Sequence, residues 1–415
     1  MDRVILHCDC NSFFASVETL DHPEYARVPM AVTGDPDNRH GIILAKNEAA
    51  KKLGVQTAET IYQARRKCPS LLCVPPHMGK YREISRKINA IYLDYTDLVE
   101  AFSVDESYLD VTGSLHLFGC DARTLADTLR ERVRREVGIT ISVGVSFCKV
   151  FAKLGSDYRK PDATTVFDRQ AVREVAYALP VSSLLYVGKK TAEQLSWMGI
   201  STIGELAAAD PALLQRTLGE QGRVISCYAR GMDEEPVRSY YEKRDTKSIG
   251  NGTTFRRDLM TAEEIRVGLL MLCDEIVYRL RESGKMCTVL QVTIRDPDFH
   301  TIQRQCPLPY PTWLQDALVE TAYSLVLTNW KRGSRIRMLT VTAQGLVPWN
   351  TATEQMTVFD TPPEQNRTTK KEKLEAALTE IRRKKGRASI YRGIYDKEEI
   401  GISNCKTDAA EEKGK

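Results

Sequence analysis

The segment from Ser103 to Thr112 constrains the fold and the chemistry of this chain more than any other. Two adjacent carboxylates, Asp105 and Glu106, lie between two apolar runs that are typical of β-strands. Neighbouring negative charges repel each other, and burying them is costly unless a cation or protons compensate. An acidic pair at the bend of an apolar hairpin therefore indicates a site for a hard divalent metal. A solvated, acid-rich turn is the alternative that this segment alone leaves open.

A third carboxylate lies near the N-terminus. Residues 4–10 have the apolar pattern of a short buried strand, and Asn11 and Ser12 are typical N-cap residues for the helix expected after it. Asp9 thus falls at the carboxyl end of a strand, where open α/β sheets tend to place their ligands. The sequence predicts that Asp9 faces the same site as the hairpin acids.

These acids form a candidate catalytic and metal-binding set. If the two strands are neighbours, Asp9, Asp105 and Glu106 converge. Three carboxylates with a backbone carbonyl, such as that of Cys10, suit Mg²⁺, which takes oxygen ligands and keeps substrate phosphates in its shell. Two such ions about 4 Å apart would serve an in-line displacement at phosphorus.

The motifs around these acids resemble those of Y-family DNA polymerases, the translesion enzymes. Further segments fit the same family in the same order over roughly residues 1–350. The matching segments are residues 9–18, 103–110, 150–154, Lys160-Pro161 and 247–250. The resemblance implies a low-fidelity, template-directed DNA polymerase that uses two Mg²⁺ ions to add a dNMP from a dNTP to a primer 3′-OH.

The order of predicted elements gives the same organisation. A β-α-β-β-α-β order is expected from a strand, helix, hairpin, helix and strand at residues 4–10, 79–96, 99–112, 121–137 and 139–146. The fold class is α+β multidomain: a ferredoxin-like palm with inserted fingers, a helical thumb and an α/β little finger, as in a right-hand polymerase. The expected domains are palm 1–19 and 78–165, fingers 20–77, thumb 166–239, little finger 245–347, and a clamp-binding segment with a basic tail at 348–415.

Substrate contacts follow from the resemblance. Phe14 stands five residues after Asp9, at the position of the family's steric gate, where a ring blocks the 2′-OH of a ribonucleotide. Phe13 fits the core, and its backbone amide is expected near the triphosphate. Lys160 matches the palm lysine that holds the β- and γ-phosphates.

The fingers depart from the common family pattern. Glu48 and Lys51 stand where many members have Tyr and Arg, so Lys51 offers a point charge in place of a bidentate fork. Asn47 is a candidate for a replacement hydrogen bond to the substrate. This segment is closer to the branch of the polymerase V catalytic subunit, so the choice between a polymerase IV-like and a polymerase V-like chain stays open.

Primer-template DNA is the expected macromolecular ligand. Gly188, Lys189 and Lys190 resemble a degenerate helix-hairpin-helix turn, which could bind a DNA phosphate through backbone N–H groups. An ordinary helix-helix turn is the alternative there. Lys247 and Ser248 match a little-finger motif that contacts DNA.

A short peptide beyond the little finger resembles the bacterial sliding-clamp-binding motif. It contains Gln355, Met356, Val358 and Phe359. The aliphatic-aromatic pair could enter an apolar pocket on the clamp, although local packing would also explain it.

The helix expected at residues 370–385, amphipathic and basic at its end, could pack on the body or touch DNA.

Composition agrees with a DNA-binding chain of several domains. The net charge of +4 is unevenly spread, with basic residues in excess at 243–346 and 366–393. The 11 cysteines include no C-x-x-C pair, so reduced thiols in the cytoplasm are expected. No run is apolar enough to span a membrane. The expected oligomeric state is a monomer.

Two other functions use parts of the same pattern. A nucleotidyl cyclase also places two acids on a ferredoxin-like palm, but it would not need the thumb, the basic domain or the clamp peptide. A non-catalytic, clamp-bound DNA-binding protein would need no acid triad. Lesion specificity and any accessory subunits are not encoded in these motifs.

Overall fold

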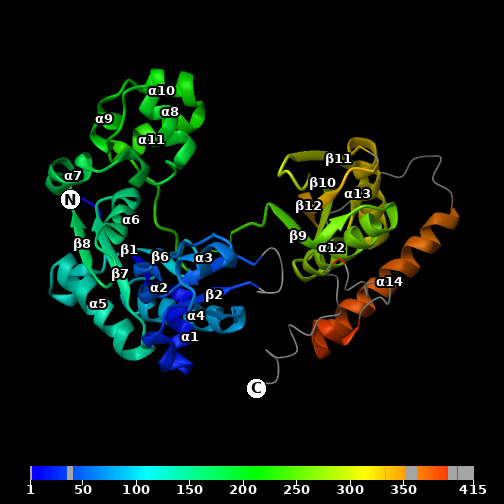
Figure 1. The fold of residues 1–415 in the computed structure, drawn as a ribbon, viewed down its shortest axis with the longest axis horizontal. Coiled ribbons are helices and arrows are strands. Elements are labelled where there is room, and N and C mark those ends of the chain that lie inside the picture. Colours follow the sequence, from blue (N-terminus) through cyan, green and yellow to red (C-terminus); the bar gives the residue numbers. More distant parts are fainter. Residues whose placement is uncertain are drawn as a thin grey trace. The chain divides into compact units, whose positions relative to one another are not determined.

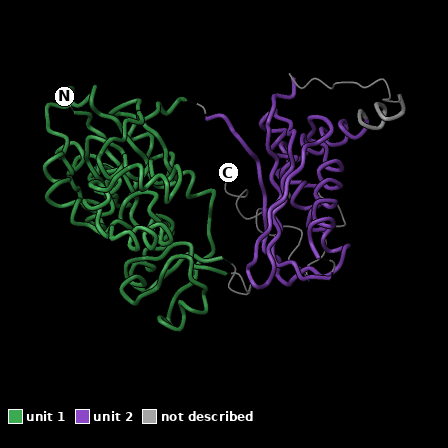
Figure 2. The backbone as a smooth tube through the Cα atoms, turned by 90° about the horizontal axis from the view of Figure 1, so that it is seen from above, with its two compact units in different colours: residues 1–37, 41–243 green, residues 38–40, 244–415 purple. Residues whose placement is uncertain are grey.

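The computed structural model describes residues 2–34, 41–242, 244–331, 333–350, 362–390 and 400. The chain divides into two compact units, which are coloured separately in Figure 2. One unit comprises residues 1–37 and 41–243, and the other comprises residues 38–40 and 244–415. Each is described by itself below, with the element labels of Figure 1.

The palm is a five-stranded sheet in the order β5-β6-β1-β7-β8. The central strand β1 lies antiparallel to both β6 and β7. The predicted β-α-β-β-α-β order is present, and a further strand, β8, pairs in parallel with β7, which the sequence pattern did not indicate. The bounds are β1 Ile5–Cys10, α4 Met78–Leu93, β5 Val99–Ala101, β6 Glu106–Asp110, α5 Ala122–Val137, β7 Ile141–Ser146 and β8 Thr164–Phe167.

The two faces of the palm sheet have different roles. Side chains alternate between the faces of a strand. On β1, Leu6 and Cys8 enter the main apolar core with α4 and α5, whereas His7 and Asp9 contact α6 (Lys149–Tyr158) or the loop after it. A Cβ on Gly144 of β7 would lie 1.8 Å from a backbone oxygen of α6, so the missing side chain lets this helix pack directly on the sheet.

The fingers form a small separate sheet in the order β3-β2-β4, which packs with short helices around its own apolar cluster. The thumb is helical and has a third apolar cluster. In and before the fingers, the bounds are α1 Phe13–Asp21, η1 Pro23–Arg27, β2 Met30–Thr33, β3 Ile43–Lys46, α2 Glu48–Lys52, α3 Ile61–Lys67 and β4 Leu72–Val74. The palm also contains the short helix η2 Leu115–Phe118. In the thumb, the bounds are α7 Arg169–Glu174, η3 Ala176–Ala178, η4 Val181–Ser183, α8 Lys189–Trp197, α9 Ile203–Ala208, α10 Pro211–Leu218 and α11 Glu220–Ala229.

The second unit contains a four-stranded antiparallel sheet in the order β11-β10-β12-β9, and its core is shared with α12 and α13. This is the α/β domain predicted after residue 244. The bounds are β9 Ser248–Leu259, α12 Ala262–Glu282, β10 Lys285–Arg295, β11 Thr301–Thr312, α13 Gln315–Asn329, β12 Ile336–Pro348, α14 Pro362–Lys385 and η5 Arg387–Ser389.

The last long helix, α14, is attached to this domain by ion pairs. Arg382 lies 2.9 Å from Asp274 of α12, and Lys371 lies 2.7 Å from Asp316 of α13. The sequence left open whether this helix packs on the body or touches DNA, and these contacts place it on the body. Two of its apolar side chains, Leu374 and Ile381, are 55% and 39% exposed.

Candidate active site of the palm

The palm sheet brings the three predicted acids together. Asp9 on β1 lies directly opposite Glu106 on β6, and residues opposed in an antiparallel pair share one face of the sheet. The backbone oxygen of Asp105 accepts a hydrogen bond of 3.0 Å from the amide of Cys10, which fixes the bend beside the end of β1. The predicted convergence of a strand end and a hairpin is therefore present. The Cys10 side chain is buried in the core, so only its carbonyl could face a ligand.

Burial and crowding perturb these carboxyl groups. Desolvation by burial is the main cause that raises the pKa of Asp9 to about 7, and the negative charge of Glu106 adds to it against the opposing charge of Lys160. Burial also raises the pKa of Asp105, although a hydrogen bond of 2.6 Å from the Ser103 hydroxyl opposes this shift. The site therefore favours protonation or a cation, which distinguishes it from a solvated turn.

Two lysines already supply positive charge to the acids. The Lys160 ammonium group lies 2.6 Å from Asp9, and the Lys153 ammonium group lies 2.9 Å from Glu106. Burial opposes the charge on Lys160, but the nearby carboxylates outweigh it and raise its pKa. Lys153 belongs to a predicted family motif without an assigned role, and its contact with Glu106 was not anticipated.

This donor set fits a hard divalent cation. Carboxylate oxygens are the ligands that Mg²⁺ prefers, and substrate phosphates complete its shell. The ammonium groups of Lys153 and Lys160 lie on oxygens of Glu106 and Asp9 respectively. Glu106 and Asp9 therefore each already bind a positively charged group, the ammonium group of a lysine. Asp9, Asp105 and Glu106 are thus the residues that could hold metal.

Asn11 fixes the loop that carries Lys160. Its side-chain oxygen accepts hydrogen bonds from the amide of Asp162 at 2.9 Å and from the Thr140 hydroxyl at 3.0 Å. Ser12 occupies the predicted N-cap position of α1, but its φ is 49° and its side chain caps no amide of the described chain. The predicted position of the N-cap is therefore confirmed, but the predicted side-chain capping is wrong. Asn11 makes the long-range contacts instead.

The predicted gate residue is supported from behind by another ring. Phe14 is half-buried and stacks on Tyr81 of α4 with ring centroids 4.2 Å apart and planes 12° apart. The Tyr81 hydroxyl donates to the buried carboxylate of Glu18. Phe13 is buried in the core, as expected. Phe14 therefore packs against a ring that is itself hydrogen-bonded to Glu18.

The fingers residues are arranged less tightly. Lys51 pairs only loosely with Glu48, at 3.5 Å, and both side chains are about half exposed. The Asn47 side chain accepts from the amides of Met30 and Ala50 and donates to two backbone carbonyl groups. Its polar atoms are thus occupied in holding the start of α2, which favours a supporting role for Asn47.

The predicted DNA-contact residues lie on exposed turns, one in each unit. Gly188 is the N-cap of α8, and Lys189 and Lys190 begin that helix with exposed side chains. Lys247 and Ser248 are exposed at the start of β9. The predicted clamp-binding residues Gln355, Met356, Val358 and Phe359 lie outside the described residues.

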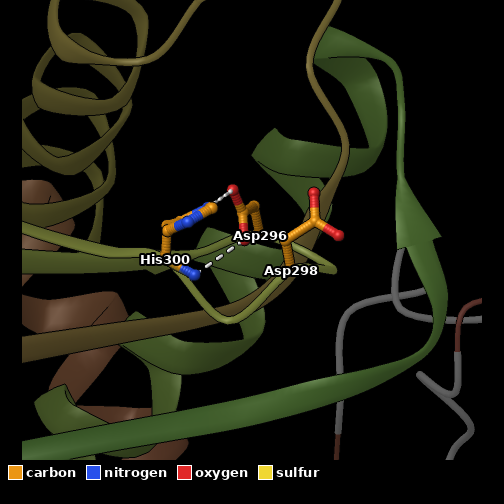
Figure 3. Close-up of side chains that lie close together, drawn as sticks. All are labelled: Asp296, Asp298 and His300. Carbon is orange, nitrogen blue, oxygen red and sulfur yellow. Dashed lines mark hydrogen bonds and ion pairs between the residues drawn. The ribbon is translucent and has the colours of Figure 1, made fainter.

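Another cluster of possible ligand atoms occurs in the turn between β10 and β11 (Figure 3). Asp296, Asp298 and His300 bring one ligand atom each within 4.8 Å of one another. His300 binds Asp296 through its backbone amide at 2.8 Å and its ring at 3.1 Å, and His300 and Asp298 are exposed. These bonds account for the placement of Asp296 and His300 as a capped turn. Among the described helices, none is both long and apolar enough to cross a membrane.

Known proteins of one family match this sequence and this fold. Models of the impB/mucB/samB family and of its C-terminal domain match residues 8–157 and 246–358. DNA polymerase IV of Acetivibrio thermocellus is 42% identical over 394 residues, which cover 95% of this chain and 98% of that protein. DNA polymerase IV 1 of Bacillus subtilis is 34% identical, with 96% and 94% covered.

A solved Y-family DNA polymerase chimera has the same fold, with a TM-score of 0.72 over 83% of this chain and 99% of that one, at 21% identity. The chain belongs to the Y-family of DNA polymerases, in the impB/mucB/samB family. Within it, the relatives place the chain with DNA polymerase IV and settle the choice that the fingers segment left open. It is therefore a DNA-directed DNA polymerase, and neither the cyclase nor the non-catalytic alternative is supported.

Proposed function

We propose that this chain is a low-fidelity translesion polymerase that extends a primer 3′-OH from dNTPs by two-metal-ion catalysis at Asp9, Asp105 and Glu106. The observation that carries this proposal is the direct opposition of Asp9 and Glu106 across β1 and β6, with Asp105 at the adjoining bend. Metal ions bound there, which we expect to be two Mg²⁺, would activate the attacking hydroxyl and stabilise the leaving pyrophosphate.

The protein's own contribution is to hold substrate and charge in place. Phosphoryl transfer depends mainly on positioning and on electrostatic stabilisation. Lys160 is already beside Asp9, so its ammonium group can turn to the β- and γ-phosphates when a dNTP enters. Lys51 offers a second positive charge from the fingers, and the backbone amides near Phe13 and Phe14 are oriented by the start of α1.

Phe14 would select deoxynucleotides by a clash with a 2′-OH. A gate of this kind works only if the ring cannot swing aside, because otherwise a ribonucleotide would be admitted. The stacking on Tyr81 and the bond from Tyr81 to Glu18 supply that restraint. We therefore assign Phe14 as the steric gate.

DNA binding and recruitment complete the proposal. The exposed turns at Gly188–Lys190 and at Lys247 and Ser248 would contact phosphates without reading base sequence. Residues 355–359 would bind the bacterial sliding clamp, and this tether would raise the local concentration of a monomeric enzyme at the primer end. Small fingers would tolerate damaged templates, as in the family that the motifs resemble.

Primer extension tests the proposal directly. The full chain is incubated with a primer annealed to an undamaged template or to one with an abasic site, all four dNTPs and Mg²⁺. We expect template-directed extension that EDTA abolishes and excess Mg²⁺ restores, with some products beyond the lesion. Absence of incorporation under conditions where the DNA is bound would contradict the catalytic proposal, and arrest at every lesion would contradict the translesion part.

A further inference from the structure

The two lysines at the catalytic acids belong to one continuous series of ion pairs. Lys153 lies on α6, and Asp157 follows four residues later, so their side chains are on the same side of that helix. Lys160 comes three residues further on, just beyond the end of α6. Asp157 lies 3.7 Å from Lys153 and 2.8 Å from Lys160. It is thus the acidic residue between the two lysines.

The series runs from one catalytic acid to the other. Glu106 pairs with Lys153, Lys153 with Asp157, Asp157 with Lys160, and Lys160 with Asp9. Charges alternate along it, so each lysine is attracted from two sides. Among the described residues, both ion-pair partners of Asp157 are lysines, Lys153 and Lys160. It acts on the site only through the lysines.

Burial differs along this series in a way that matters for substrate binding. The Asp9 side chain is 7% exposed, Lys160 is 28% exposed and Asp157 is 48% exposed. A lysine side chain has several rotatable bonds and loses considerable entropy when it is fixed. When Asp9 is engaged by a metal, Lys160 loses its nearer partner. Of its two ion-pair partners in the described chain, Asp157 then remains to orient it.

We propose that Asp157 is a positioning residue for the incoming nucleotide, because it holds Lys160 at the place where the triphosphate binds while Asp9 is engaged. This inference rests on the proposed function and assigns a role to a residue outside the acid triad and the gate. The chemical group recognised is the β- and γ-phosphate of the dNTP. Asp157 does not touch it, and its effect passes through Lys160.

Steady-state single-nucleotide incorporation tests this role. Asp157→Asn removes the charge but keeps the shape, and we expect it to raise the KM for dNTP roughly threefold to tenfold while kcat changes less than twofold. Asp157→Glu restores the charge and should bring KM back to within about twofold of wild type. Glu131→Gln is the matched control, since it removes an exposed acid from α5 of the same palm and should leave both constants unchanged.

A double-mutant cycle separates positioning from a general loss of structure. In a Lys160→Met background, Asp157→Asn should add less than a twofold effect on KM, because the residue through which it acts is gone. Binding of a non-hydrolysable dNTP to the protein–DNA complex should weaken by the same factor as KM rises, which gives a readout apart from turnover.

Three results would overturn the inference. They are an unchanged KM in Asp157→Asn, a failure of Asp157→Glu to improve on Asp157→Asn, and full additivity with Lys160→Met. Wild-type extension in the same assay keeps this inference separate from the proposed function. If wild type extends the primer and the variants behave identically, only the role of Asp157 fails.

Discussion

Two acidic clusters of this protein look alike in sequence but differ in physics. The palm acids lie at the end of a buried strand, and burial raises the pKa of Asp9 to about 7. At Asp296 in the β10–β11 turn, burial acts to raise the pKa, but the hydrogen bonds from His300 act more strongly in the other direction. The pKa of Asp296 is therefore lowered. Burial makes the charged form of Asp9 unfavourable, so a cation would stabilise it, whereas hydrogen bonds within the turn already stabilise the charged form of Asp296.

This difference is the reason to propose a function for the palm acids and none for the acids of the turn. Asp105 and Glu106 could have formed a turn like that of Asp296 and Asp298, in which Asp298 is exposed and Asp296 is hydrogen-bonded by His300. The palm acids differ because a neighbouring strand adds Asp9 opposite Glu106 and because α6 packs closely enough for lysines to reach them. Convergence and burial, more than acidity, are therefore the grounds on which we propose these acids as the catalytic set.

The largest expected effect separates the two clusters by mutation. Asp105→Ala or Glu106→Ala removes a candidate metal ligand, and we expect primer extension to fall by roughly 100- to 1,000-fold or more. Asp296→Ala removes an acid of the turn and should change the rate by less than about twofold. Extension by Asp105→Ala and Glu106→Ala at the wild-type rate would contradict the proposed difference between the clusters. The palm acids would then be no more necessary for primer extension than the acids of the turn.

The second prediction concerns Phe14, the proposed steric gate near the palm acids. Phe14→Ala should raise the ratio of ribonucleotide to deoxynucleotide incorporation by roughly 10- to 100-fold, because the ring no longer meets the 2′-OH. The measurement is kcat/KM for matched rNTP and dNTP opposite one template base. Phe299→Ala is the control, since Phe299 is an exposed ring in the β10–β11 turn and should leave the ratio unchanged. An unchanged ratio in Phe14→Ala would remove the gate.

The third prediction concerns the pH dependence of metal binding, and its expected effect is the smallest of the three. A metal must displace the proton from Asp9, so below a pKa of about 7 the proton competes with binding. We expect the affinity for Mn²⁺ to rise between pH 6 and pH 8, by at most about tenfold per pH unit, and to level off above the pKa. Titration of free Mn²⁺ by electron paramagnetic resonance measures it. Affinity that is constant over this range would contradict the assigned shift at Asp9.

Much of the fold was predictable because it follows from local patterns. The apolar pattern predicted the first four palm strands, the palm helices α4 and α5 and their order along the chain, but it did not predict α6. Strand β8 was missed because Thr164–Phe167 is short and follows a proline-containing loop. In a pattern read along one segment, a four-residue strand is hard to distinguish from a loop.

The acids were predictable, but their partners were not. Strand ends and a hairpin bend have positions that a sequence pattern can indicate. Lys153 and Asp157, four residues apart on α6, are also what a solvated helix face would show. The contact of Lys153 with Glu106 depends on how closely α6 approaches β7, which tertiary packing decides. Asn47 and Asn11 illustrate the same limit, because hydrogen bonds to distant backbone groups leave no local signature.

Anomalous scattering from Mn²⁺ tests the central claim most directly. Crystals of the enzyme with primer-template DNA and a non-hydrolysable dNTP would be grown with Mn²⁺ and measured at the manganese absorption edge. The account predicts two peaks about 4 Å apart, bounded by carboxylate oxygens of Asp9, Asp105 and Glu106, and none at the Asp296 turn. Manganese bound elsewhere, with no peak at these three acids, would contradict it.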